Sequence, residues 1–135
     1  MKRAIILAAI LLLGCKNPFS FEPHDRNKTD PPAPPVPTVP SNGKFIKNWA
    51  YPQDVTFRWQ PVSGTQFYQV EAYTDSILIP DNMCHFEDKI PSNEASITFH
   101  HYGTYWWHVR SYSPNWKWYT DWSELYSFIL PNPAD

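Results

Sequence analysis

The sequence has little of three features that would narrow its function. It contains two cysteines, so at most one disulfide can form within the chain. Its charges nearly balance, with 11 Lys and Arg against 13 Asp and Glu, and the basic residues are scattered along the chain. This pattern disfavours nucleic-acid binding, because phosphate backbones attract clustered positive charge. No apolar run reaches the length of about 20 residues that a transmembrane helix needs.

The first fourteen residues have the pattern of an export signal. Residues 1–14 read MKRAIILAAILLLG, with two basic residues, a short apolar run and a small residue at the end. That order is typical of a secretory signal peptide. The alternative, a buried N-terminal helix, is disfavoured because a polar, proline-rich tract follows at once. Without Lys2 and Arg3 the basic residues fall from eleven to nine against thirteen acidic ones, a net charge of −4.

The end of this segment, LLGC (12–15), resembles the lipobox of bacterial lipoproteins. The resemblance implies that a peptidase cuts before Cys15, that its thiol carries diacylglycerol, and that acyl chains hold the mature protein on a membrane. Lys16 stands where an aspartate would favour the inner membrane, so the resemblance implies the outer membrane, on its periplasmic or its surface side. Cys84 then has no cysteine to pair with.

Residues 15–43 are expected to be a lipidated cysteine followed by a proline-rich linker. Six of the ten residues from Pro31 to Pro40 are proline. Such a tract favours the extended polyproline II form over a helix or a central strand. After Cys15, a fully extended linker reaches roughly 80 Å at about 3.1 Å per residue. The alternative of a PxxP ligand for a partner domain stays open.

Residues 44–131 hold nearly all the aromatic residues of the mature chain and are expected to form one domain, with 132–135 as a tail. Apolar and polar residues alternate within short segments that are separated by turn residues, as in half-buried strands. No window shows a helical period. The economical fold for strands of this number and spacing is an all-β sandwich of two sheets. The clearest alternating segments are 55–60, 67–74 and 103–112.

Three segments of this domain resemble the fibronectin type III family. The resemblance implies an immunoglobulin-like (fibronectin type III) two-sheet sandwich of about seven strands over roughly residues 36–131. It makes Trp59 and Tyr68 core aromatics, and it makes Tyr105 the tyrosine that hydrogen-bonds back across a corner between two strands. With these three, Trp107 and Val109 are expected to be buried. The segments are VTFRWQPVSGTQFYQVEAYTD (55–75), GTYWWHVRSYS (103–113) and DWSELYSFIL (121–130).

The sequence offers weak candidates for chemistry. Cys84 lies beside His85, and His100 lies beside His101, but neighbours on a strand point to opposite faces. A catalytic Cys–His pair is therefore disfavoured, and Cys84 is expected to be a half-buried thiol. A structural zinc site needs four ligands, often in tightly spaced pairs. The Cys and His residues named above do not by themselves make such a site. We expect no enzyme, no metal and no cofactor.

The aromatic residues at the C-terminal end of the domain are the candidate binding surface. Tryptophan faces can stack on sugar rings, aromatic groups or cations. A structural role stays open, because WYTDWS (118–123) loosely resembles the WSxWS motif of cytokine receptors, in which tryptophans stack with arginine in a ladder. The candidate residues are Trp106, His108, Arg110, Trp116, Trp118 and Tyr119.

A more specific expectation concerns Glu71 and Arg110. If their strands are neighbours, the two charges should face each other at the centre of an exposed recognition face. The alternative is that Arg110 stacks on Trp116 or Trp118 and holds the adjacent loop.

The sequence therefore predicts an exported, lipid-anchored module that binds an envelope protein or a surface polymer without catalysis. Two alternatives remain, a purely structural spacer or accessory subunit of an envelope complex, and a carbohydrate-binding module that uses its tryptophans. Exposed tryptophans favour binding, whereas buried tryptophans favour the spacer.

Overall fold

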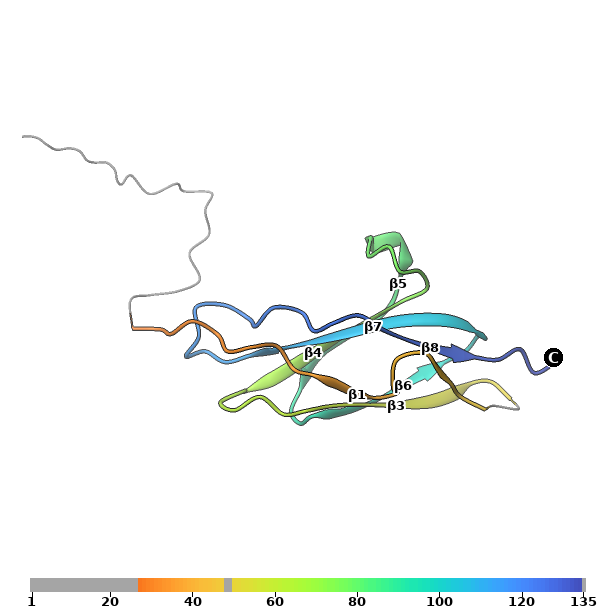
Figure 1. The fold of residues 1–135 in the computed structure, drawn as a ribbon, viewed down its shortest axis with the longest axis horizontal. Helices are drawn as coiled ribbons and strands as arrows, with labels where there is room; N and C mark the ends of the chain where they lie inside the picture. The colour runs from red at the N-terminus through yellow and green to blue at the C-terminus, as the bar shows by residue number, and fades with distance from the viewer. Residues whose placement is uncertain (1–26, 48–49, 135) are drawn as a thin grey trace, which may run out of the picture.

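A computed structural model describes residues 27–47 and 50–134. The predicted signal peptide and Cys15 lie outside these residues. The described chain forms two facing β-sheets (Figure 1). The three-stranded sheet has the order β1 (Pro37–Val39), β3 (Gln53–Trp59), β6 (Glu94–Phe99). The five-stranded sheet has the order β2 (Lys44–Phe45), β8 (Tyr126–Leu130), β7 (Gly103–Tyr112), β4 (Phe67–Tyr73), β5 (Met83–Ile90).

The pairing of these strands confirms the predicted all-β, immunoglobulin-like sandwich. Strands β3 and β6 pair antiparallel in one sheet, and β4 pairs antiparallel with both β5 and β7 in the other. The single short helical turn among the described residues is a 3-10 helix at Pro80–Asn82. No helix in the described part of the chain is both long and apolar enough to cross a membrane.

Alternation along the strands determines which residues form the core. In β3 the side chains of Val55, Phe57 and Trp59 are buried, whereas Thr56 and Arg58 between them are exposed. A strand turns successive side chains to opposite faces, so one face of β3 packs inward and the other meets solvent. The prediction for this segment is confirmed.

Edge-to-face aromatic contacts dominate the core between the sheets. The Phe57 ring lies 4.8 Å from that of Trp107 and 5.6 Å from that of Phe128, both nearly perpendicular to it. Trp59 meets Tyr68 in the same way at 5.3 Å. Such pairs contribute about 0.5–1.5 kcal/mol beyond the area they bury. The five residues predicted to be buried are all buried: Trp59, Tyr68, Tyr105, Trp107 and Val109.

The hydroxyl of Tyr105 has the role that the family resemblance implies. It donates a 2.7 Å hydrogen bond to the backbone carbonyl of His101, four residues earlier. This bond joins strand β7 to the corner that follows β6. Burial raises the pKa of the Tyr105 hydroxyl, which keeps it protonated as a donor.

The middle of the domain is more regular than its sequence indicates. Strand β5 runs from Met83 to Ile90 along the edge of the five-stranded sheet, with two register shifts against β4. Most of its side chains are exposed, so the strand lacks the apolar alternation that reveals a half-buried strand. Cys84 is an exposed residue of this strand, but its thiol is partly buried where it donates to the carbonyl of Ala72.

The predicted boundary between linker and sandwich at residues 43 and 44 is wrong. Residues 37–39 form strand β1, and the amide of Gln60 donates to the carbonyl of Val36 at 2.9 Å. Prolines are tolerated there because β1 is an edge strand, where a missing amide leaves no ladder bond unmade. Further upstream, Thr29 forms a bridge with Trp116. The described chain therefore contacts the sandwich from Thr29 onward.

The N-terminal chain passes from one sheet to the other. After β1 it turns at Gly43, which adopts a φ of 81°, a left-handed conformation that glycine takes without strain. Strand β2 then pairs in parallel with β8 in the opposite sheet. The same segment thus covers an edge of both sheets.

Replacing Trp59 with alanine tests the assignment of the core. Trp59, on the three-stranded sheet, is 1 % exposed and contacts the rings of Tyr68 and Trp107 on the opposite sheet. We expect Trp59→Ala to lower the free energy of unfolding by about 3–5 kcal/mol, as truncation of a large core aromatic does. Urea denaturation of the variant and the unchanged protein measures this loss in the free energy of unfolding. Trp118→Ala, at an exposed tryptophan, is the control, and a loss below about 1 kcal/mol at Trp59 would contradict the assignment.

Candidate functional site

The connection between β7 and β8 folds back along β7. The amide of Thr120 donates to the carbonyl of Ser111 at 2.9 Å, and the amide of Ser123 donates to that of Val109 at 2.8 Å. The hydroxyls of the same threonine and serine accept from the amides of Ser111 and Val109 at 3.1 and 3.0 Å. These four bonds hold the connection alongside β7 before β8 begins. They place the side chains of residues 119 and 122 over the outer face of β7.

Two rings of this connection enclose the guanidinium of Arg110. Its central carbon lies 3.9 Å from the ring centre of Tyr119 and 4.4 Å from that of Trp122. The Trp122 ring also stacks on the ring of His108, with 4.0 Å between the ring centres and an angle of 8° between the rings. We call this stack, in the order His108, Trp122, Arg110 and Tyr119, the Arg110 ladder. The sequence left open such a stacking of aromatic residues with arginine. The partners of Arg110 are, however, Tyr119 and Trp122 rather than Trp116 or Trp118.

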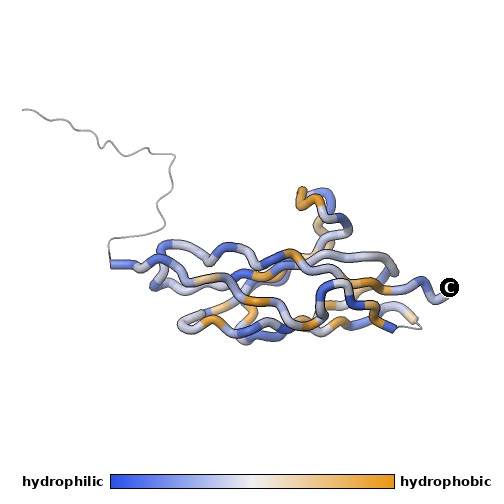
Figure 2. Tube along the Cα trace, viewed as in Figure 1, coloured by the Kyte–Doolittle hydropathy of each residue, from blue (hydrophilic) through white to orange (hydrophobic). Residues whose placement is uncertain are grey.

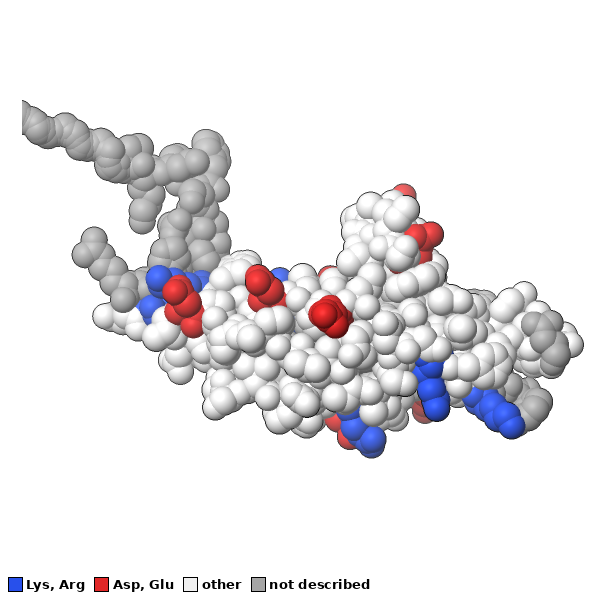
Figure 3. All heavy atoms as spheres, viewed as in Figure 1, with Lys and Arg blue, Asp and Glu red and all other residues white. Residues whose placement is uncertain are grey.

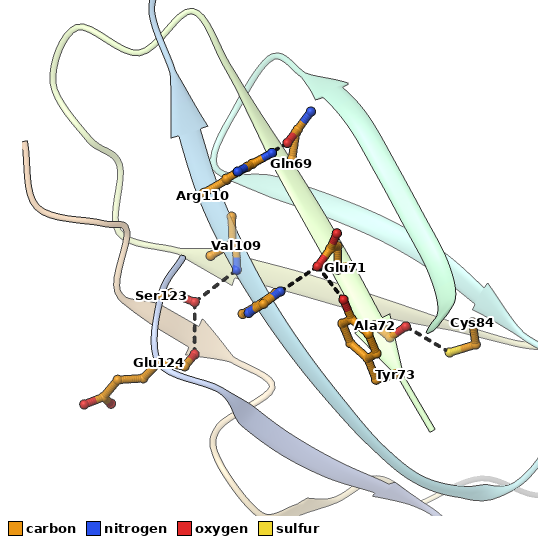
Figure 4. A network of polar contacts seen from close by, with 10 residues as sticks. Gln69, Glu71, Ala72, Tyr73, Cys84, Val109, Arg110, Ser123 and Glu124 are labelled. Carbon is orange, nitrogen blue, oxygen red and sulfur yellow. Dashed lines mark hydrogen bonds and ion pairs between the residues drawn. The ribbon is translucent and has the colours of Figure 1, made fainter. Parts of the chain in front are cut away.

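A row of polar contacts lies beside the ladder (Figure 4). Gln69 accepts a 2.8 Å hydrogen bond from Nε of Arg110, and its amide nitrogen donates to Asp88 at 2.9 Å. Glu71 accepts a 2.7 Å hydrogen bond from the hydroxyl of Tyr73, and its Oε1 lies 2.8 Å from Nε2 of His108. The hydrogen bond from Gln69 is the main reason that the pKa of Asp88 is lowered.

Burial governs the ionisation of the ladder. Desolvation lowers the pKa of His108, and the hydrogen bond to Glu71 opposes this only in part. The imidazole is therefore neutral at pH 7, and Nε2–H donates to the carboxylate. Desolvation also lowers the pKa of Arg110 from its usual value, but a guanidinium in a protein stays charged. The ladder thus holds one full positive charge between two rings.

The predicted contact between Glu71 and Arg110 is wrong. In the register of β4 and β7, Glu71 is opposite His108, and Gln69 is opposite Arg110. The two charged residues do lie on the same outer face, as predicted, but they are offset by two positions along it. The carboxylate pairs with His108 instead.

The structure does not bring the six candidate residues together in one place. His108, Arg110 and Tyr119 belong to the ladder, with His108 buried and the other two half-buried. Trp106 is half-buried further along β7, and Trp116 is buried beneath the connection. Trp118 is 47 % exposed. These residues therefore do not form one open face.

An open pocket of about 470 Å³ lies at the end of the sheet beside the ladder. Phe67, Tyr112 and Tyr119 form one ring cluster, with centres 4.9 Å apart for Phe67 and Tyr112 and for Tyr112 and Tyr119. We call this space the aromatic pocket. Its lining residues are Lys28, Phe67, Lys89, Tyr112, Trp116, Lys117, Trp118 and Tyr119.

Five of these lining residues were not among the sequence candidates. Phe67 and Tyr112 are opposite each other at the ends of β4 and β7, a relation that depends on register. Lys28 is brought in by the N-terminal segment, in which the carbonyl of Thr29 accepts from the amide of Lys117 at 2.8 Å. Lys89 comes from β5, and its Nζ lies 4.9 Å above the Phe67 ring.

No family model matches this chain, and no curated protein matches it. Solved structures that are similar to it include the following two. One is described as an Fn3-like protein from Clostridium thermocellum, with a TM-score of 0.48, 18 % identity, and coverage of 75 % of this chain and 95 % of that one. The other is the fibronectin type III domain of human fibronectin type III domain containing protein 3, with a TM-score of 0.48, 14 % identity, and coverage of 78 % and 91 %.

The residues considered for chemistry have other partners. The Cys84 thiol donates to the carbonyl of Ala72 at 3.3 Å, and desolvation raises its pKa to about 11. The His85 ring packs edge-on against Phe99 at 4.6 Å, and desolvation lowers its pKa. A thiol with a raised pKa is a poor nucleophile at neutral pH. Among residues 27–47 and 50–134, no three His, Cys, Asp or Glu side chains gather in a way that could hold a metal ion.

A second surface feature lies between β4 and β5. Residues 74–82 rise from the sheet as an apolar protrusion (Figures 1 and 2). At its tip, Ile77, Leu78 and Ile79 are 62 %, 40 % and 47 % exposed. Asn82 fixes the shape, since its side chain donates to the carbonyl of Ile77 at 2.8 Å and its carbonyl accepts from the amide of Thr74. Acidic side chains also lie on the protrusion (Figure 3).

The ladder predicts how stability depends on pH. Because the pKa of His108 is lower in the folded state, the unfolded chain takes up a proton first as the pH falls through about 6.5, and the fold loses stability. We expect His108→Gln, which can still donate to Glu71, to reduce the loss between about pH 7 and pH 5. The pKa of His85 is also lowered in the folded state, so part of the loss of stability remains in this variant.

Urea denaturation at several pH values measures this dependence. His101→Gln, at the exposed corner before β7, controls for the loss of a histidine outside the ladder. An unchanged slope in His108→Gln would show that this imidazole is not shifted as described.

Proposed function

We propose that this protein is an exported lipoprotein, anchored to the outer membrane through acyl chains on Cys15, that acts on the cell envelope as a non-catalytic binding module. The anchor is supported by the basic start, the apolar run and the LLGC segment (12–15). Two or more acyl chains hold a protein on a bilayer firmly, so no transmembrane helix is needed.

The observation that carries the binding role is the aromatic pocket. Most of the candidate aromatic surface is used inside the fold, because Trp116 is buried and Trp122 stacks in the ladder. Trp118 differs, since it is 47 % exposed and lines an open pocket together with four other aromatic residues. Exposed aromatic residues that gather with cations around a cavity are typical of binding sites rather than of spacers.

The pocket lies at the end of the sandwich where the described chain begins. Asn27, the turn before β4 and the β7–β8 connection all lie at this end (Figure 1). The twelve residue-to-residue steps from Cys15 to Asn27 span at most about 40 Å. The tether is therefore about half as long as the linker expected from the sequence, and the site would face the region next to the membrane.

A protein partner that docks on the apolar protrusion is a second candidate function. Three adjacent apolar side chains are exposed at its tip, and hydrogen bonds hold the loop in one shape. Exposed apolar patches with a polar rim are typical of protein interaction sites. The rim here includes Asp75 and Asp81, so a partner would present basic residues.

The lipid anchor is tested by Cys15→Ala. We expect the variant to stay as an uncleaved precursor and to incorporate no radiolabelled palmitate, because the thiol that accepts the lipid is gone. Cys84→Ala is the matched control and should be cleaved and labelled normally. Normal labelling of Cys15→Ala would contradict the anchor.

The binding role is tested by capture from detergent-solubilised envelope with the intact lipoprotein as bait. We expect Trp118→Ala to lose captured material that the exposed control Tyr102→Ala retains. If Leu78→Ser loses a protein partner instead, the protrusion is the binding surface. If all variants capture the same material, or none capture any, the protein is a structural spacer.

A further inference from the structure

We infer that the aromatic pocket binds an acidic polysaccharide, with a sugar ring stacked on Trp118 and carboxylates facing the lysines of the lining. This inference rests on the proposed binding role of the pocket and names the class of its ligand. It joins two observations, an exposed indole whose neighbours hold it in place and a lining whose only charged residues are basic.

The rings around Trp118 form a stacking surface. Trp118 meets Tyr119 edge-on at 5.2 Å, and Tyr119 is in turn held by the guanidinium of Arg110 and by the ring of Tyr112. The indole is thus supported from the ladder side and still 47 % exposed. An aromatic face carries partial negative charge, and the C–H face of a pyranose carries partial positive charge, so the two attract.

The charges of the lining select among sugars. Lys28, Lys89 and Lys117 line the pocket, and no acidic residue among residues 27–47 and 50–134 does. They come from three separate segments, the N-terminal chain, β5 and the β7–β8 connection. The whole chain carries a net charge of −2, so this concentration of lysines runs against the overall balance. A ligand with carboxylates complements the lining, whereas a neutral sugar uses only the rings.

Two carboxylates outside the lining contact these lysines. Asp30 Oδ1 lies 3.2 Å from Lys117 Nζ, and Asp88 Oδ2 lies 3.9 Å from Lys89 Nζ. The side chain of Asp30 is 84 % exposed, and that of Lys89 is 73 % exposed. Exposed ion pairs contribute little to stability, so a ligand carboxylate can replace either contact at little cost.

The openness of the pocket favours a polymer over a free monosaccharide. Each lysine and ring offers a modest contact with solvent close by. A chain that repeats the same acidic sugar presents many equivalent ligands at high effective concentration, which raises the overall affinity. Single-stranded nucleic acid also combines rings with negative charge, but the net negative charge of this protein disfavours it.

The test uses the purified full lipoprotein in neutral detergent micelles, with binding measured by isothermal titration. The probes are oligogalacturonate, its methyl ester, alginate oligomers and oligothymidylate. We expect oligogalacturonate or alginate to bind, and the methyl ester, which keeps the sugar ring but loses the charge, to bind about tenfold more weakly. Added salt should weaken the binding of the acidic ligands, because it screens the attraction between exposed charges.

Matched variants assign the binding to the pocket. Trp118→Ala and the double variant Lys89→Gln with Lys117→Gln should each weaken acidic binding by about tenfold, the loss expected when a central contact is removed. Tyr102→Ala and Lys44→Gln, which remove an exposed ring and an exposed lysine elsewhere, should not. Circular dichroism confirms that each variant is folded.

Three outcomes would overturn the inference. They are failure to bind both acidic polymers, equal affinity for the methyl ester, and equal or tighter binding of oligothymidylate. Each differs from failure of the proposed function, because envelope capture that depends on Trp118 would still show that the pocket binds a ligand of another class.

Discussion

The stacking of Arg110 between Tyr119 and Trp122 is the contact on which this end of the molecule depends. Hydrogen bonds to Ser111 and Val109 hold the backbone of the connection between β7 and β8 along β7. Arg110 provides a fixed cation on β7, and the two rings that enclose it hold the side chains of the connection against the sheet. Cation–π contacts shielded from water reach about 2 kcal/mol, more than an exposed ion pair provides.

The ladder also explains why some aromatic residues of this short segment pack on the sheet while another stays exposed. Rings that face β7 are used to hold the connection, so they cannot also meet a ligand. The residue before Tyr119, Trp118, lies at the surface with the Tyr119 ring behind it. Tyr119 belongs to both groups, because Arg110 lies over its ring while the same residue lines the aromatic pocket. The structural and the exposed aromatic groups therefore support each other.

Much of the fold could be predicted from the sequence, because one face of each central strand is buried. Alternation at Val55, Phe57 and Trp59 shows which side chains point inward. Alternation does not show register, since a shift of two residues leaves every side chain on the same face. The offset between Glu71 and Arg110 is a shift of this kind. The pocket was beyond prediction for a similar reason, because Lys28, Phe67 and Lys89 meet only through the pairing of distant segments. The proline content of residues 31–40 indicated an extended chain, but it did not show that part of this chain pairs with β3 as a strand.

The bridge at Thr29 determines where a mechanical load would enter the molecule. Tension along the chain from the N-terminal side reaches Thr29 before it reaches β1. There it meets two backbone hydrogen bonds, from Thr29 to Asn115 at 3.0 Å and from Lys117 to Thr29 at 2.8 Å. Both join the N-terminal chain to the connection that lines the pocket. The sandwich would then remain intact while the aromatic pocket opens first, so tension on the N-terminal chain would change the shape of the pocket before it disturbs the core.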